Sequence, residues 1–142
     1  MGQVGTFGEM QVLDRRQELS VRALVAVLVT DAVYNLAPNT WMDADLEHLQ
    51  VPRRLRYVFA SAKASAAAGL MLRHRSPHLA KVAASGLVIY FVLAIGAHVR
   101  IRDEAWRYGF AVAMLGWAGV TLRRLSSDAE VEPARSLVRK QS

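Results

Sequence analysis

The sequence contains no cysteine, which excludes disulfide bonds, thiolate nucleophiles and cysteine metal sites from this chain. It also lacks a glycine-rich phosphate loop, a catalytic triad and a paired-carboxylate arrangement. Acidic residues are few relative to basic ones, with 12 Asp and Glu against 18 Lys and Arg. If the protein takes part in redox chemistry, another molecule must carry the electrons.

Four apolar stretches dominate the chain, in which 53% of the residues are hydrophobic. They contain 19, 18, 20 and 17 residues, close to the roughly 20 that an α-helix needs to cross a bilayer. The third has no charge between residues 82 and 97, whereas a helix of a soluble four-helix bundle, the alternative, would have one polar side. We therefore predict an all-α integral membrane protein with spans at 19–37, 55–72, 79–98 and 106–122.

The connections between these spans indicate how the helices are arranged. Connections of six residues (73–78) and seven residues (99–105) make consecutive helices antiparallel neighbours, as in an up-down four-helix bundle. The first loop, 38–54, is longer and contains several acidic residues. We expect it to fold over one end of the bundle.

Individual residues mark where the spans begin and end. Pro38 is expected to end the first span, because proline is disfavoured inside a helix. Ser76 and Pro77 are expected to begin the third, as N-cap and first-turn proline. Asp103 is the candidate N-cap of the fourth.

The basic residues are shared unequally between the two sides of the predicted bundle. Cytoplasmic segments carry the excess of Lys and Arg, so a count of eleven against six predicts a multi-pass protein of the cell membrane with both termini cytoplasmic. The N-terminal segment 1–18 and the polar tail 123–142 then both lie in the cytoplasm. The cytoplasmic eleven are Arg15, Arg16, Arg22, Arg73, Arg75, Lys81, Arg123, Arg124, Arg135, Arg139 and Lys140, and the six opposite are Arg53, Arg54, Arg56, Arg100, Arg102 and Arg107.

The formal net charge of +6 does not indicate binding to nucleic acid. The basic residues flank apolar stretches and do not line one face of a recognition helix. Attraction to anionic lipid head groups explains them more simply. The bilayer is thus the predicted partner, and no nucleic acid is expected.

Part of the chain, from the first loop to the fourth span, resembles the DoxX-like membrane proteins, a bacterial family of small four-helix proteins. The resemblance covers about 75 of 142 residues and rests on Leu49-Gln-Val-Pro52, Lys63, Ala83-Ala-Ser-Gly-Leu87, Tyr90-Phe91 and Ala94-Ile-Gly-Ala-His-Val-Arg-Ile-Arg-Asp103. Around the lysine, where family members often carry glycines, this chain has mainly Ala and Ser. The resemblance implies the four-helix fold, and it links the chain to relatives in quinone-dependent sulfur oxidation and in membrane complexes that handle oxidative stress.

Two formal charges, Asp31 and Lys63, lie well inside predicted spans, where each alone would cost at least a few kcal/mol. Antiparallel packing puts them at similar depth, so we expect them to meet. One interpretation is a structural ion pair that joins the first two helices. The other is an inner polar site within the membrane, composed of Asp31, Asn35, Lys63, Tyr34 and Tyr90, where a quinone or another amphipathic ligand would find donors and acceptors.

A second group of polar residues lies at the far end of the third span. We name it the outer polar cluster: Arg56, His98, Arg100, Arg102 and Asp103. Its basic side chains either reach towards head groups, with Asp103 as a cap, or bind an anionic head group or a quinone carbonyl beside a protonatable His98. No metal site is predicted, since the four histidines fall at both membrane faces.

Small residues are concentrated in the second span, between Ala60 and Gly69. Such residues permit close helix approach, so this helix is predicted to be the buried one. Glycines at 86, 96, 116 and 119 are expected to provide matching close contacts on the third and fourth helices.

Three functions fit these features. The first is a non-catalytic accessory subunit that assembles with itself or with a larger membrane complex. The second is a quinone-binding component of a membrane oxidoreductase, and the third is a carrier of small hydrophobic molecules. No cofactor motif chooses among them, so quinone and lipid remain candidate ligands.

Overall fold

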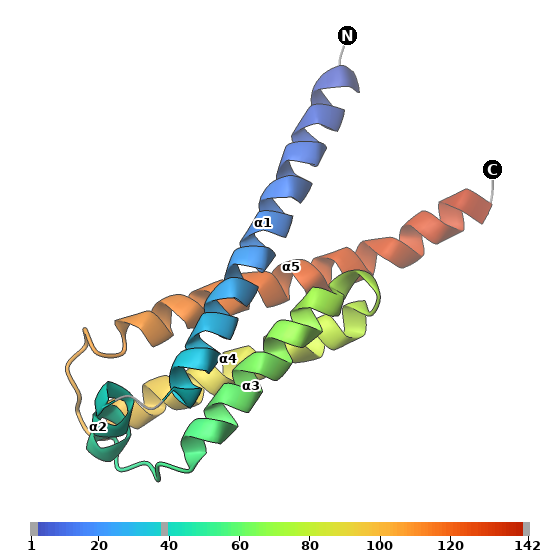
Figure 1. Ribbon diagram of the computed structural model, residues 1–142. Coiled ribbons are helices and arrows are strands. Elements are labelled where there is room, and N and C mark those ends of the chain that lie inside the picture. The colour runs from blue at the N-terminus through green and yellow to red at the C-terminus, as the bar shows by residue number, and fades with distance from the viewer. Residues whose placement is uncertain (1–2, 38–39, 141–142) are drawn as a thin grey trace.

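Helices make up almost all of the computed structural model, which describes residues 3–37 and 40–140. Four long helices, one short helix and one 3-10 turn follow one another along the chain (Figure 1). Within the described residues there is no strand, so the predicted all-α class is confirmed. The elements are α1 Gln3–Leu36, α2 Thr40–His48, α3 Leu55–Met71, η1 Leu72–His74, α4 Pro77–Arg100 and α5 Gly109–Lys140.

The long helices pack in their order along the chain. α3 packs against α1 and α4, and α4 packs against α3 and α5. The Trp117 indole of α5 also donates a hydrogen bond of 3.0 Å to the Ser20 hydroxyl of α1. In Figure 1, the turn between α3 and α4 lies towards the end from which both termini project, and α2 lies at the opposite end with the α4–α5 loop. The helix α2 therefore lies over one end of the long helices, as expected for the first loop.

One apolar core joins the four long helices. Leu24 and Leu28 of α1, Leu70 of α3, Leu87 of α4 and Ala118 of α5 are among its buried members. Each side chain in such a core makes many small dispersion contacts, which together hold the helices at fixed positions. The polar site described below is built on this packed frame.

The outer surface of the helices is also apolar in many places. On α4, the side chains of Val82, Ile89 and Leu93 are 62%, 61% and 68% exposed. Two helical segments of the described residues, Gln11–Leu36 of α1 and Pro77–Arg100, are long and apolar enough to cross a membrane. The expected spans 19–37 and 79–98 largely coincide with these two segments.

The start of α4 follows from its local sequence. The Ser76 hydroxyl accepts a hydrogen bond from the backbone N–H of Leu79 at 3.4 Å, and Pro77 occupies the first turn. The predicted N-cap is therefore confirmed. Pro38, the residue expected to end the first helix, lies outside the described residues, and α1 ends at Leu36.

The ends of α2 and α4 share a Schellman motif, in which backbone N–H groups beyond the helix return to carbonyls of its last turn. After α4, the N–H groups of Arg102 and Asp103 donate to the carbonyls of Val99 and His98, both at 3.0 Å. Arg102 adopts a left-handed backbone with φ of 55°, a conformation that glycine usually supplies at this position. The chain therefore turns back sharply and brings Asp103 against the last turn of α4.

The motif after α2 forms in the same way. Gln50, at a φ of 57°, donates to the Glu47 carbonyl at 3.0 Å, and Val51 donates to the Leu46 carbonyl at 2.8 Å. Leu46 and Leu49 are buried against the rest of the protein. The sequence predicts a loop at 38–54, whereas Thr40–His48 form this amphipathic helix.

The last long helix differs from its prediction. The fourth span was expected to begin at Trp106 with Asp103 as N-cap, but α5 begins at Gly109 and the residues between form turns. Asp103 does not cap α5, because the helix begins six residues later, and its carboxylate accepts hydrogen bonds from His48 and His98. The helix also continues to Lys140, so it includes most of the predicted polar tail 123–142.

The role predicted for the small residues is correct for one face of α3 and wrong for four glycines. Ala66, Ala67 and Gly69 of α3 are buried, whereas Ala62 and Ser65 are exposed. A Cβ atom added at Gly69 would lie 2.6 Å from the Cβ of Ala83, so glycine is needed for the close approach of α3 and α4. Positions 86, 96, 116 and 119, in contrast, have no neighbouring atom within 4 Å of an added Cβ among the described residues.

Candidate functional site

The inner polar site is centred on an ion pair between α1 and α3. The Lys63 ammonium lies 2.7 Å from Oδ2 of Asp31, and these side chains are only 6% and 19% exposed. Asn35, one turn after Asp31, donates through Nδ2 to Oδ1 of Asp31 at 3.0 Å and to its backbone carbonyl at 2.6 Å. The contact expected between the two charges is present, and it connects two helices that are separated along the chain by α2.

Lys63 also lies close to an aromatic ring. Its Nζ lies 5.3 Å from the centre of the Tyr90 ring, within the range of a cation–π interaction. The Tyr90 ring in turn makes edge contacts with Phe59 at 6.0 Å and Phe91 at 5.1 Å. Tyr34, the remaining predicted member of the site, is 46% exposed on α1. The structure thus brings Asp31, Asn35, Lys63 and Tyr90 together.

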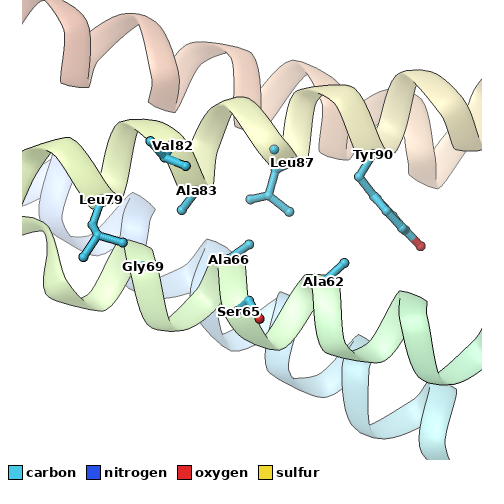
Figure 2. Close-up of a pocket in the computed structure, with 10 residues that line it drawn as sticks. Ala62, Ser65, Ala66, Gly69, Leu79, Val82, Ala83, Leu87 and Tyr90 are labelled. Carbon is cyan, nitrogen blue, oxygen red and sulfur yellow. The ribbon is translucent and has the colours of Figure 1, made fainter.

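A groove of about 300 Å³ lies beside this site, between α3 and α4. Figure 2 shows Ala62 and Ala66 of α3 facing Ala83 and Leu87 of α4, with Tyr90 at one end. Gly69 and Leu79 lie at the other end. The sequence indicated the small residues of α3 but could not indicate that they line a groove leading to Tyr90.

The outer polar cluster is organised around Asp103. Nδ1 of His98 lies 2.7 Å from one carboxylate oxygen, and Nε2 of His48 lies 3.2 Å from the other. Arg107 approaches the same carboxylate at 3.6 Å, and the Asp103 side chain is only 4% exposed. An ionised carboxylate only accepts hydrogen bonds, so this network assigns a proton to Nδ1 of His98 and to Nε2 of His48.

The electrostatic environment keeps Asp103 ionised. Burial by itself would raise the pKa of this carboxyl, but hydrogen bonds from His98 and His48 oppose that effect. The backbone N–H of Glu104 and the charge of Arg107 act in the same direction, so the pKa of Asp103 is lowered to about 2. Asp103 therefore carries a negative charge that fastens α2 and α4 to the loop before α5.

Arg56 does not join His98 in this arrangement. Its guanidinium, 12% exposed, donates to the carbonyl of Asn35 at 2.9 Å, to the carbonyl of Ala37 and to Oδ1 of Asp43 at 3.1 Å. The last carbonyls of a helix have no partner within it, so Arg56 acts as a side-chain cap for the end of α1.

The two remaining members of the outer polar cluster have separate positions. Arg100 donates to the Leu49 carbonyl at 3.3 Å, which ties α4 to the end of α2. Arg102 is exposed and forms the left-handed turn. Arg56 and Arg100 therefore do not group with His98 as expected, because their guanidinium groups donate to backbone carbonyls.

Three participants were missed from the sequence: His48, Arg107 and Asp43. Two of them, Asp43 and His48, lie in the first loop of the sequence, and their spacing on a short helix was the available signal. Their contacts join residues up to 55 positions apart, which spacing alone does not reveal. Among the described residues, no group of three or more His, Asp or Glu has a geometry suited to a metal ion.

Comparison with known proteins places the chain in a family. The model of the DoxX-like family matches residues 20–121, more than two thirds of the 142 residues, and covers the inner polar site and the outer polar cluster. No curated protein and no solved structure matches the chain. On the strength of the family match, this protein belongs to the DoxX-like family.

Proposed function

We propose that this protein is a non-catalytic accessory subunit of a membrane complex. The observation that supports this role most directly is the internal pairing of the inner polar site. Lys63 and Asn35 are directed at the two carboxylate oxygens of Asp31, at 2.7 and 3.0 Å. Among the described residues, every fully buried side-chain nitrogen or oxygen has a hydrogen-bond partner. The charges therefore serve to join α1 to α3.

The membrane part of this proposal is an up-down bundle of four transmembrane helices, α1, α3, α4 and α5, with both termini cytoplasmic. It is supported by family membership, by the two apolar helical segments in α1 and α4, and by the exposed apolar side chains of α4. The count of eleven against six basic residues supports the orientation.

The assembly part of the proposal draws on α5. Gly116 is exposed, and both Gly116 and Gly119 have open space where a Cβ would lie. Small residues on the outside of a membrane helix permit a second helix to approach closely, which favours helix association in lipid. We propose that a partner helix packs against this side of α5.

Native mass spectrometry of the full chain, released gently from its membrane, tests the proposal. We expect the 15.7 kDa chain to appear with further copies or with a second protein at whole-number stoichiometry. Gly116→Leu should remove that association by filling the open space on α5. Gly8→Leu is the matched control, because Gly8 is also open but lies before the apolar segment of α1.

A wild-type chain that is monomeric in every mild detergent would overturn the accessory role, as would equal loss of the partner in both variants. A double variant, Asp31→Leu with Lys63→Met, tests whether the ion pair only joins α1 to α3 or also takes part in binding. Retention of the partner by this variant agrees with a structural ion pair.

A further inference from the structure

A continuous series of polar contacts connects α2, at one end of the bundle, with the inner polar site. Oδ1 of Asp43 on α2 accepts a hydrogen bond from Nη1 of Arg56 at 3.1 Å, and Nε of Arg56 donates to the backbone carbonyl of Asn35 at 2.9 Å. The Asn35 side chain donates to Oδ1 of Asp31 at 3.0 Å, and Oδ2 of Asp31 lies 2.7 Å from the Lys63 ammonium. We name this series the polar network: Asp43, Arg56, Asn35, Asp31 and Lys63.

Most of the polar network is removed from solvent. Asn35 and Lys63 are buried, and the side chain of Arg56 is only 12% exposed. Because water does not readily replace a lost partner at such positions, each group depends on its neighbours in the network. Arg56 also donates to the carbonyl of Ala37, so it holds the last turn of α1 at two points. A shift of Arg56 therefore moves the end of α1, and with it the Asp31 carboxylate one turn earlier.

The polar network opens towards α2 and towards no other end of α1 or α3. Lys63 lies seven residues after Arg56, roughly 10 Å farther along α3. On the side away from α2, the buried residues that follow on these two helices are apolar: Leu24 and Leu28 on α1, and Ala66, Ala67 and Leu70 on α3. The ion pair is thus connected by polar contacts to one end of the bundle only.

Charge pairs attach α2 to the bundle more than packing does. Among the residues of α2, all of which the structure describes, only Leu46 is buried. In the described part of the chain, α2 packs along none of the long helices. Its four ionisable side chains instead pair with other segments: Asp43 with Arg53 and Arg56, Asp45 with Arg107, Glu47 with Arg53, and His48 with Asp103. Such partly exposed pairs are individually weak, so α2 is able to separate while the apolar core stays intact.

We propose that α2 is a control element for the Asp31–Lys63 ion pair. While α2 is docked, Asp43 fixes Arg56, and the polar network holds Lys63 against Asp31. When α2 separates from the end of the bundle (Figure 1), Arg56 loses this support and Lys63 is released. This goes beyond the accessory role, because it makes the end of the bundle at α2 a regulatory surface. It uses none of the α5 surface assigned to assembly.

Chemical labelling of Lys63 tests the proposal, because an ammonium ion held by a carboxylate has no lone pair with which to react. The full chain is reconstituted in phosphatidylcholine vesicles and treated with phenyl isothiocyanate, a lipid-soluble reagent for amines. Peptide mass spectrometry compares Lys63 with Lys81, a lysine of α4 outside the polar network. Asp31→Asn removes the carboxylate, should raise labelling of Lys63 at least about tenfold and sets the full response. Wild-type labelling of this variant would overturn the proposal, because Asp31 would then not shield Lys63.

Two variants of α2 with the same new charge separate undocking from a local effect of charge. Leu46→Asp places a carboxylate at the buried position, so it should expel α2 and raise labelling of Lys63 at least about threefold. Ala44→Asp adds the same charge at an exposed position and should label as the wild type does. Unchanged labelling of Leu46→Asp would refute the control by α2. A parallel rise at Lys81 would also refute it, since the whole protein would then have loosened.

Variants within the polar network test the route. Arg56→Gln and Asp43→Asn should each raise labelling of Lys63 at least about twofold, because both weaken the contact between α2 and α3. Glu47→Gln is the matched control, since this carboxylate lies on the same helix, is 77% exposed and pairs with Arg53. An equal rise in Glu47→Gln and Asp43→Asn would show that Arg56 is not the route.

Melting temperatures provide a measurement that does not depend on the reactivity of Lys63. The loss caused by Asp43→Asn should be smaller by at least about half in the double variant Asp31→Leu with Lys63→Met, because no ion pair is left to disturb. Equal losses in the two backgrounds would contradict the coupling. Gly116→Leu should leave labelling of Lys63 unchanged, so failure of assembly and failure of the polar network are distinguishable.

Discussion

Asp103 accepts a hydrogen bond from Nδ1 of His98 at 2.7 Å, although these residues are only five positions apart at the end of a helix. The left-handed turn at Arg102 makes this possible, because it directs the chain back onto α4. In a Schellman motif the same two positions usually make an apolar contact. Here the contact is a buried histidine–aspartate pair, extended to α2 by His48.

The lowered pKa of Asp103 predicts a pH dependence. The folded state holds this pKa at about 2 against an ordinary value of 3.8, so the unfolded chain binds its proton first as the pH falls. Stabilisation by ionised Asp103 is therefore complete above about pH 5 and is lost as the pH falls towards 2. We expect the difference in melting temperature between wild type and Asp103→Asn to shrink over this interval. A difference that stays constant between pH 5 and pH 2 would contradict the assignment.

The ion pair predicts non-additive effects of mutation. Asp31→Ala or Lys63→Met leaves one charge without its partner in a buried site, which typically costs about 3 to 5 kcal/mol. The double variant has no uncompensated charge, so it should melt at a higher temperature than at least one single variant. Thermal unfolding in detergent completes the cycle, and strictly additive losses would show that the pair does not interact.

The exposed pair of Arg22 and Glu18, at 2.6 Å, provides the control for that cycle. Its members are 70% and 42% exposed, and Glu18 also pairs with the less exposed Arg73 at 3.7 Å, so Arg22 is the residue to remove. Arg22→Ala should change the free energy of unfolding by only about 0.3 to 0.5 kcal/mol. A loss as large as that at Lys63 would mean that burial is not the cause.

Gly69 predicts a steric effect. Gly69→Ala places a Cβ 2.6 Å from that of Ala83, and overpacking of this kind costs about 1 to 3 kcal/mol, partly offset by roughly 1 kcal/mol of helix propensity. Ala83→Gly in the same chain should relieve the clash and restore much of the melting temperature. Gly96→Ala, where the space is open, should leave stability unchanged or increase it. A stabilising Gly69→Ala would disprove the close approach.

Removal of the Arg56 side chain should destabilise the end of α1. Arg56→Ala removes the donors to the Asn35 and Ala37 carbonyls and to Asp43, and one such charge-assisted bond is worth about 1.5 to 3 kcal/mol. The neighbouring Arg54 is exposed, so Arg54→Ala should change stability by no more than about 0.5 kcal/mol. Hydrogen exchange at the end of α1 measures the effect directly, and equal exchange in the two variants would exclude capping.

The proposed orientation predicts which residues an impermeant thiol reagent reaches. The chain has no cysteine, so single cysteines at exposed Trp41 and His74 report without background. In intact cells the reagent should label Trp41→Cys and leave His74→Cys unlabelled until the membrane is opened. The opposite labelling pattern would show that the chain has the reverse orientation in the membrane.

Local chemistry allowed parts of this protein to be predicted from its sequence. Ser76 and Pro77 begin a helix because the hydroxyl and the ring act within one turn. The apolar stretches predict the regions of α1 and α4 that can cross a membrane, because only length and composition matter for that property. Asp31 and Lys63 had to find partners because an isolated charge is costly there, and α1 and α3 are neighbours along the chain.

Contacts between distant segments were decided only by the tertiary structure. Asp103 looked like the cap of α5, but His48, 55 residues earlier, and His98 bind its carboxylate. Arg56 looked like a head-group ligand, but the end of α1 offers it unpaired carbonyls. The open glycines and the α3–α4 groove likewise depend on how far apart two helices settle. Sequence spacing defines which side chains share one helix face, whereas the partner that each side chain meets depends on the packing of every other helix.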